Sequence, residues 1–249
     1  MSGRVATSSH DGVLEVTFEN ARRRNALSLS LLSALSRVID DARTGDVRAV
    51  VLAGAGDGFS AGADLADLKG TIEDRAMDDA IAGAAASIRD CTVPVVAAVE
   101  GPCIGGALEV ALSCDAIVAA EGAYFALPAT QLGLLYDPRA VMRLRRRLNP
   151  AALRWLLLLG ERIDARDGAA MGLVARVVRE GTARAEARAL VERISARSPH
   201  AVAATKTLLN ELEQGFARLD EWERVRLDIL ASTDRRERVE QAKARLGLA

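Results

Sequence analysis

The segment Ile104-Gly105-Gly106-Ala107-Leu108-Glu109-Val110 carries the strongest indication of fold in this chain. It follows Pro94-Val-Val-Ala-Ala-Val-Glu-Gly101, an aliphatic run closed by glycine that is typical of a buried strand. It leads into residues 107–114, whose helical spacing places Gly106 at a predicted helix start. The first N–H groups of a helix lack internal partners and lie at the positive end of its dipole. The segment therefore predicts a backbone site for an oxygen atom that gains negative charge.

A second glycine-bearing segment, Phe59-Ser-Ala-Gly-Ala-Asp-Leu65, has a similar setting. It follows Val47-Arg-Ala-Val-Val-Leu-Ala-Gly54, which also has a buried-strand pattern, and Gly56-Asp-Gly58 breaks any helix between them. Residues 61–63 are therefore expected in a loop at the carboxyl end of that strand. Because glycine opens unusual dihedrals and leaves neighbouring N–H groups uncovered, we expect one N–H from each segment to meet a single ligand oxygen.

The two segments, in this order and setting, resemble the enoyl-CoA hydratase/isomerase (crotonase) superfamily. Ala61-Gly-Ala-Asp-Leu65 matches the family pattern Ala-Gly-x-Asp-Leu, and residues 101–109 match Gly-x-x-x-Gly-Gly-x-x-Glu. Cys114-Asp115 and a further strand pattern follow, and the similarity runs from Val13 to about Lys206. The resemblance implies an α/β fold of the ClpP/crotonase type, a spiral of ββα units with a C-terminal helical trimerisation region.

The element pattern divides the chain into two regions. The other predicted elements of the first region are a strand over 13–18, helices over 28–42 and 73–89, and a short strand over 174–178. From residue 183 onward the pattern is amphipathic helix, interrupted at Ser198-Pro199 and near Gly215. We expect residues 1–195 to form a crotonase-fold core with the CoA and oxyanion-hole site, and residues 196–249 to serve oligomerisation. The resemblance implies a homotrimer or a dimer of trimers, which is a hexamer.

Composition narrows the class of protein. The 249 residues are half hydrophobic, and 33 basic against 34 acidic residues give a net charge of −1, with no bias toward nucleic acid or anionic membranes. No apolar stretch reaches the roughly 18 residues of a membrane span, and the longest run, Trp155–Gly160, is expected to be a short buried helix. Cys91, Cys103 and Cys114 lack the spacing of a disulfide framework or zinc site. We expect a cytoplasmic protein with no metal, no tightly bound cofactor, and no nucleic-acid or membrane partner.

The chemistry expected of the family is stabilisation of a thioester enolate. A carbanion beside a thioester carbonyl moves charge onto the oxygen, and preplaced donors stabilise that charge more than the neutral ground state. The resemblance assigns the donors to the backbone N–H groups of Ala63 and Gly106. Glu109, three residues after Gly106, is the acid/base candidate. A glutamate at a helix start also favours the dipole without catalysis, but its place in the motif favours the catalytic interpretation.

The segment Phe125–Gly133 departs from the family pattern. Family hydratases carry a second glutamate directly after a proline, and here Pro128 is followed by Ala129. Hydration needs one group to activate water and another to supply a proton, which paired carboxylates provide. With Ala129 ordinary efficient hydration is in doubt. A single carboxylate can still move a proton between carbons, as an isomerase does, or orient one water with help from another group.

Tyr136, which precedes Asp137-Pro138, is the candidate for that help. The segment also resembles the methylmalonyl-CoA decarboxylase branch, whose tyrosine lies near the departing carboxylate. A tyrosine that only packs its ring is the alternative interpretation. Three functions therefore stay open: hydratase/isomerase chemistry in fatty acid metabolism, decarboxylation of a malonyl-type CoA, and non-catalytic acyl-CoA binding. Loss of the second glutamate favours the last, and retention of Glu109 opposes it.

Coenzyme A is expected as part of the thioester substrate. The family binds it with the stretch occupied here by Arg22–Leu27, and guanidinium groups match phosphate oxygens. The backbone near Ala26 and Ala61 is expected to meet the adenine. The full set of expected coenzyme-binding residues comprises Arg22, Arg24, Ala26, Ala61, Asp64, Leu65, Ile104, Gly105, Pro128 and Ala129.

Other basic residues receive different predictions. Lys206, on a late helix, is a further candidate for the phosphates, whereas Arg143 and Arg145–Arg147 are expected to form an exposed helix face. The acyl pocket is expected between residues 68–86 and 134–142, where apolar residues favour an apolar chain but give no length.

Overall fold

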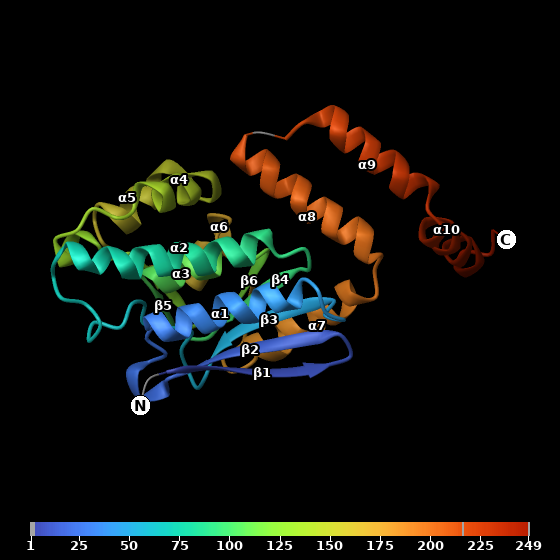
Figure 1. Cartoon of the computed structure of the whole chain (residues 1–249). Coiled ribbons are helices and arrows are strands. Elements are labelled where there is room, and N and C mark those ends of the chain that lie inside the picture. Colours follow the sequence, from blue (N-terminus) through green and yellow to red (C-terminus); the bar gives the residue numbers. More distant parts are fainter. Residues whose placement is uncertain (1–2, 216, 249) are drawn as a thin grey trace.

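The computed structural model of the protein describes residues 3–215 and 217–248. Strands alternate with helices up to residue 195, and the chain is helical thereafter (Figure 1). The strands are β1 (Arg4–His10), β2 (Val13–Glu19), β3 (Ala49–Gly54), β4 (Val95–Val99), β5 (Pro102–Ile104), β6 (Ala116–Ala120), β7 (Tyr124–Ala126), β8 (Ile163–Asp164) and β9 (Arg176–Val178). The helices are α1 (Leu29–Ala42), α2 (Arg75–Asp90), α3 (Gly106–Leu112), α4 (Pro138–Arg147), α5 (Pro150–Leu157), α6 (Ala165–Ala170), α7 (Ala183–Ser195), α8 (Pro199–Gln214), α9 (Leu219–Ala231) and α10 (Thr233–Arg245). Short 3-10 turns are η1 (Ala21–Arg23), η2 (Ile72–Asp74) and η3 (Thr130–Leu132).

Six strands form the main sheet in the order β1-β2-β3-β4-β6-β9. Only the β1–β2 pair is antiparallel, joined by a two-residue turn in which Asp11 and Gly12 both have positive φ. The remaining pairs are parallel, so β3 and β4 end at the same edge. Both glycine-bearing segments start from that edge, where α/β sheets commonly bind ligands. The second sheet has the order β5-β7-β8. Its first strand, β5, connects β4 to α3 along the chain.

Helices cover both faces of the main sheet, which explains the continuous apolar character of β3 and β4. Successive side chains of a strand point to opposite faces. Val50 and Leu52 join the cluster that contains the buried faces of α1, α2 and α3. Val51 and Ala53 pack instead with the buried face of α7. All residues of both strands are buried, so these strands fix the centre of the core.

Helix α8 is joined to the core through Lys206. This buried ammonium donates to the carbonyl oxygens of Ile88 (3.2 Å) and Val93 (3.0 Å) and to Asp115 Oδ2 (2.7 Å). The prediction that Lys206 reaches the coenzyme phosphates is therefore wrong. A buried ammonium requires partners, and its three donors are already used within the core.

Helices α9 and α10 extend from α8 away from the sheet (Figure 1). Among their described residues none is buried. Within residues 3–215 and 217–248, no helix combines the length and the apolarity that crossing a bilayer requires.

The prediction of a buried helix over Trp155–Gly160 is also wrong. Helix α5 ends at Leu157 and buries only Ala152 and Leu156. Trp155 is 45% exposed, and Leu158 and Leu159 are exposed as well. Five consecutive apolar residues point around the whole circumference of a helix, whereas one face alone meets the core.

Candidate active site

The two glycine-bearing segments lie directly against each other. The N–H of Ile104 donates to the Ser60 oxygen (3.1 Å), and the N–H of Ser60 donates to the Pro102 oxygen (3.0 Å). Gly62 has φ +89°, and a Cβ at this position would lie 2.5 Å from the Ile104 oxygen. Only glycine satisfies both the backbone conformation and the close approach. Segments about 40 residues apart in sequence thus form one loop pair at the edge of the main sheet.

Gly105 and Gly106 form the start of α3. Gly105 has φ +58°, and a Cβ added there would meet no atom within 4 Å, so its outer side faces open space. Its N–H donates to the Ala126 oxygen (2.8 Å), which fixes the turn. Gly106 allows α2 to pack closely, since a Cβ would lie 2.4 Å from Ile81 Cδ1. As the first helical residue, Gly106 has no acceptor for its N–H inside the helix.

Ala63 lies between two backbone hydrogen bonds to Leu27. The N–H of Leu27 donates to the Gly62 oxygen (2.8 Å), and the N–H of Asp64 donates to the Leu27 oxygen (2.9 Å). These bonds hold the peptide on each side of Ala63. Within the described residues, neither the Ala63 N–H nor the Gly106 N–H has an acceptor in the chain. Both donors are therefore free to bind an oxygen atom of a ligand.

Glu109 is 5% exposed on the first turn of α3. The Tyr136 hydroxyl donates to Glu109 Oε2 (3.3 Å), and the Arg143 guanidinium pairs with Oε1. A buried carboxylate needs such partners, and each of its oxygens has one. Burial and the neighbouring Glu109 charge raise the pKa of Tyr136 well above its usual range. Tyr136 therefore stays a neutral hydrogen-bond donor at ordinary pH.

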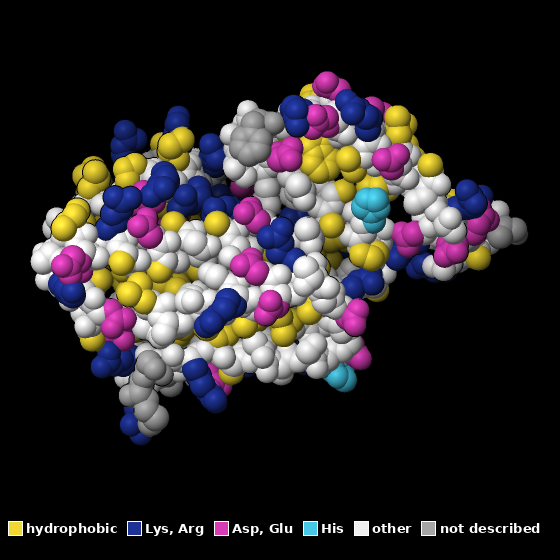
Figure 2. All heavy atoms as spheres, in the orientation of Figure 1, with side chains coloured by type: hydrophobic (Ala, Val, Ile, Leu, Met, Phe, Trp, Pro, Cys, Tyr) yellow, Lys and Arg dark blue, Asp and Glu magenta, His cyan; other side chains and the backbone are white. Residues whose placement is uncertain are grey.

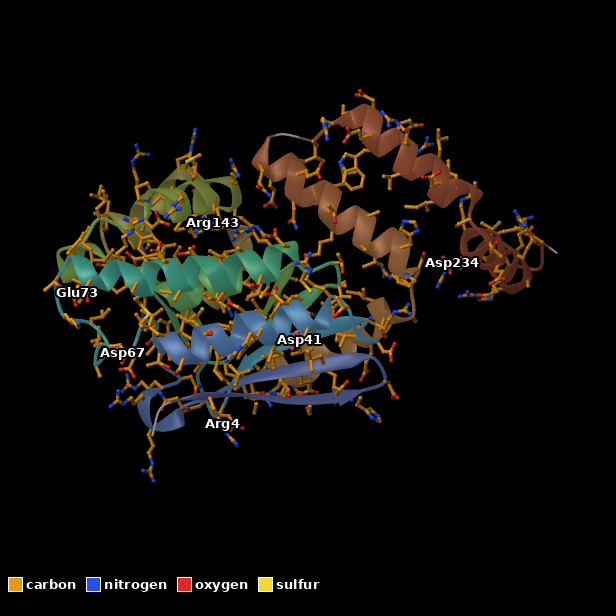
Figure 3. The ribbon with its side chains drawn as sticks, in the orientation of Figure 1. Arg4, Asp41, Asp67, Glu73, Arg143 and Asp234 are labelled. Atoms are coloured by element: carbon orange, nitrogen blue, oxygen red, sulfur yellow. The ribbon has the colours of Figure 1, made fainter. Side chains whose placement is uncertain are left out.

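The prediction of an exposed helix face over Arg143 and Arg145–Arg147 is confirmed for Arg145 and Arg146 but is wrong for Arg147, which is half-buried, and for Arg143. Its side chain is 25% exposed and lies under α4, toward α2 (Figure 3). Ala140, Arg143, Leu144 and Arg147 follow the i, i+3, i+4, i+7 spacing of a core-facing helix side. Ala140 and Leu144 are buried, so this spacing was a usable signal in the sequence. Arg143 therefore belongs to the site, although the basic composition of residues 143–147 predicts exposure.

Asp137 places a second carboxylate near the same guanidinium. It caps α4, accepting from the Arg139 N–H (3.1 Å), and Pro138 follows as the first helical residue. Its Oδ2 lies 4.0 Å from Arg143 Nη2. The guanidinium thus lies between Glu109 and Asp137. Asp137 was not a candidate from the sequence, although Asp before Pro is a recognisable helix start.

The segment Phe125–Gly133 has Ala129 at the position of the second family glutamate and so contributes no carboxylate there. Ala129 is buried directly before η3, and Pro128 is half-buried. The Ala129 oxygen accepts from the N–H groups of Leu132 and Leu134 (both 3.0 Å), which closes the turn on itself. Glu109 and Tyr136 are therefore the sequence-predicted acid/base groups that lie in contact.

The arginine stretch expected to bind the coenzyme is tied to the first glycine segment. Arg23 Nη1 contacts both carboxylate oxygens of Asp64 (3.0 and 2.8 Å). Burial alone would raise the pKa of Asp64, but hydrogen bonds from the Ala66 N–H and Arg23 outweigh it and hold the pKa below its usual value. Arg22 and Arg24 are exposed, so their guanidinium groups are accessible to phosphates.

Asn25 organises this stretch and was missed by the sequence reasoning. Its buried amide donates to the oxygens of Ala55 (2.8 Å) and Gly58 (3.0 Å), and its Oδ1 accepts from the Asn20 N–H (3.0 Å). Arg24 and Asn25 both have positive φ, which an asparagine tolerates better than most residues. Of the other expected coenzyme-binding residues, Ala26 is buried, Ala61 and Ile104 are half-buried, and Leu65 is exposed.

Solved structures of related proteins share the fold of this chain. Among solved structures, an enoyl-CoA hydratase from Polaromonas sp. JS666 matches with a TM-score of 0.83 at 33% identity, covering 91% of this chain and 90% of that chain. An enoyl-CoA hydratase from Bacillus anthracis matches with a TM-score of 0.89 at 27% identity, covering 97% and 96%. The fold is therefore an α/β fold of the crotonase type.

The sequence comparisons agree. The family model described as enoyl-CoA hydratase/isomerase matches residues 8–243. The chain is 34% identical over 211 residues to a carnitinyl-CoA dehydratase from Citrobacter koseri, covering 84% of this chain and 80% of that protein. The chain belongs to the enoyl-CoA hydratase/isomerase family.

Proposed function

We propose that this chain is an acyl-CoA enzyme that forms a thioester enolate and moves protons with Glu109. The backbone N–H groups of Ala63 and Gly106 hold the enolate oxygen. The observation that carries the proposal is the position of Glu109, buried one helical turn after Gly106 and beside the Tyr136 hydroxyl. Donors placed in advance for a developing oxyanion contribute on the order of 3 kcal/mol each to lowering the barrier.

The site supports isomerisation of an enoyl-CoA better than hydration. Glu109 removes a proton from C2 of a 3-enoyl thioester, and the electron pair moves onto the thioester oxygen. The same carboxylic acid then returns the proton to C4, which leaves the double bond between C2 and C3. This reaction needs one proton-carrying group and no activated water, in agreement with Ala129 at the position of the second glutamate.

Decarboxylation of a malonyl-type CoA is the second candidate, favoured by the location of Tyr136 at Glu109. Departure of carbon dioxide generates the enolate directly, so the N–H pair is sufficient to stabilise the product of that step. Tyr136 would then donate to the departing carboxylate.

We further propose how the substrate and the subunits are held. Coenzyme A binds as part of the substrate, with its phosphates at Arg22 and Arg24. Residues 1–195 form the catalytic core, and residues 196–249 assemble it as a homotrimer or a dimer of trimers. The lack of burial along the described residues of α9 and α10 supports this role, since helices normally bury one face. Analytical ultracentrifugation of the full chain and of a chain ending at residue 214 measures the assembly directly.

A panel of thioesters tests the reaction. The chain is expected to interconvert 3-enoyl-CoA and 2-enoyl-CoA, as separated by chromatography, whereas mass spectrometry detects addition of water or loss of carbon dioxide. Glu109→Gln should lower kcat by at least about a hundredfold, which is a typical loss for a general acid/base group. Glu240→Gln, on exposed α10, is the control and should keep full activity. Tight acyl-CoA binding with no turnover of any thioester would contradict the proposal and favour a binding protein.

A further inference from the structure

A cavity of about 250 Å³ opens beside Glu109 and continues away from the glycine segments. Among the described lining residues Glu109 is the one nearest to Gly106 along α3, and Leu112 and Ser113, one turn further along, also line the wall. Helix α4 covers it, and Asn210 and Gln214 close it from α8. From Gly106 to Ser113 the chain rises about 10 Å at 1.5 Å per helical residue. A thioester carbonyl at Gly106 would therefore direct a medium-length acyl chain past Glu109 and into this cavity.

The lining of the cavity is strongly basic. Among the described residues that line it, two carry carboxylates, Glu109 and Glu213, and five are arginines: Arg89, Arg139, Arg143, Arg146 and Arg147. Arg139 is also paired with Asp79 and Asp137, which lie outside this lining. Lys and Arg side chains gather over α4 in the surface view (Figure 2). Burial, together with the positive charges of Arg143 and Arg147, lowers the pKa of Arg89. The arginines thus repel one another, and an anion in the cavity would relieve that repulsion.

Some guanidinium N–H groups of these arginines lack a close hydrogen-bond partner among the described residues. Arg143 uses Nη2 for Glu109, while its buried Nε has no partner among the residues that the structure describes. Arg89 reaches Ser113 Oγ only at 3.5 Å, whereas Arg147 reaches the Cys114 oxygen at 3.3 Å and pairs through Nε with Glu213 at 3.6 Å, which leaves one of its terminal nitrogens for a ligand. A buried donor without a partner is costly, and guanidinium groups bind carboxylates through paired hydrogen bonds.

We propose that this cavity binds a carboxylate at the far end of the acyl chain, so that the preferred substrate is the CoA thioester of a medium-chain dicarboxylic acid. The inference rests on the proposed function, because the acyl chain must start at the Ala63 and Gly106 donors. It revises the expectation of a purely apolar acyl pocket. Residues 134–142 are mostly apolar in sequence, with Asp137 and Arg139 as charged exceptions, but the helix that they enter turns arginines toward the cavity.

Matched substrates test the inference. We compare a 3-enoyl-CoA that ends in a carboxylate with the methyl-terminated thioester of the same chain length. The carboxylate is expected to raise kcat/KM at least tenfold, chiefly through a lower KM. Carnitinyl-CoA, whose acyl group carries a quaternary ammonium, should bind more weakly than either. Equal or better use of the methyl-terminated thioester would overturn the inference while leaving the proposed function intact, whereas no turnover of any thioester would overturn the proposed function.

Three consecutive arginines provide matched variants. Arg146 and Arg147 line the cavity, whereas Arg145 is exposed and does not. Arg147→Gln should remove most of the preference for the carboxylate while keeping turnover of the methyl-terminated thioester. Arg146→Gln, at an exposed position whose replacement leaves the fold intact, should reduce the preference in the same direction, and Arg145→Gln should leave it unchanged. The assignment would be overturned if all three substitutions changed the preference for the carboxylate equally, or if none of them changed it.

Discussion

At the scale of single residues, two side chains from the region around α4 meet the carboxylate of Glu109 on α3. Glu109 lies on α3, Tyr136 precedes α4, and Arg143 lies on α4. Tyr136 donates to one carboxylate oxygen and Arg143 pairs with the other. Burial and the neighbouring Glu109 charge raise the pKa of the Tyr136 phenol above that of a tyrosine in the unfolded chain.

This contact predicts a pH-dependent loss of stability. Burial and Glu109 raise the pKa of Tyr136 in the folded chain, so above about pH 10 the phenol ionises in the unfolded chain first. The unfolded state then binds fewer protons, and the free energy of unfolding falls by about 1.4 kcal/mol per pH unit. Urea unfolding of Tyr136→Phe between pH 8 and 11 should therefore lack this fall in the free energy of unfolding with pH. It should remain in Tyr124→Phe, and an unchanged slope in Tyr136→Phe would refute the assignment.

The sequence identified Glu109 and Tyr136 as candidates because each stands at a fixed distance from a motif. A basic run is normally solvated, which predicts a surface position for Arg143, whereas its helical register relative to Leu144 indicates the core-facing side. For Lys206, its charge alone favours a contact with phosphates. In both cases the partner lies far away in sequence, Glu109 for Arg143 and Asp115 for Lys206, and no local pattern specifies such a pairing.

At the scale of elements, Lys206 is the buried charged contact between α8 and the core, in addition to the Asn210 amide, which donates to the Arg89 oxygen (2.7 Å). Lys206→Met should lower the free energy of unfolding by about 3 kcal/mol, because it leaves Asp115 and two carbonyl oxygens without their buried donor. Lys243→Met is the matched control, since its pair with Glu240 is exposed and should contribute less than about 1 kcal/mol. Denaturant titration compares the two variants, and equal losses would show that Lys206 does not anchor the helix.

Long elements with a regular pattern were predictable from the sequence. The helix expected over 28–42 is α1, which begins after the Ser28 cap, and the strand expected over 13–18 is β2. The short strands β5, β7 and β8 were not predicted. Strands of two or three residues carry too little alternation to be recognised, and their partners are set by the folded chain.

At the scale of the whole molecule, the fold explains why two distant motifs act together. Strands β3 and β4 are parallel neighbours, so the segments that follow them emerge side by side. This juxtaposition was predictable because each motif followed a strand pattern. The cavity beside Glu109 was not, since α3, α4 and α8 enclose it from segments about a hundred residues apart.

Exchange of the C2 hydrogen of a saturated acyl-CoA in deuterium oxide tests the central claim most directly. Such a thioester cannot be hydrated or isomerised, so deuterium at C2 reports enolate formation alone. The wild-type chain is expected to incorporate deuterium, detected by mass spectrometry, and Glu109→Gln should slow incorporation at least about a hundredfold. Absence of exchange by the wild type while the thioester is bound, or equal exchange by Glu109→Gln, would contradict an enolate site served by Glu109.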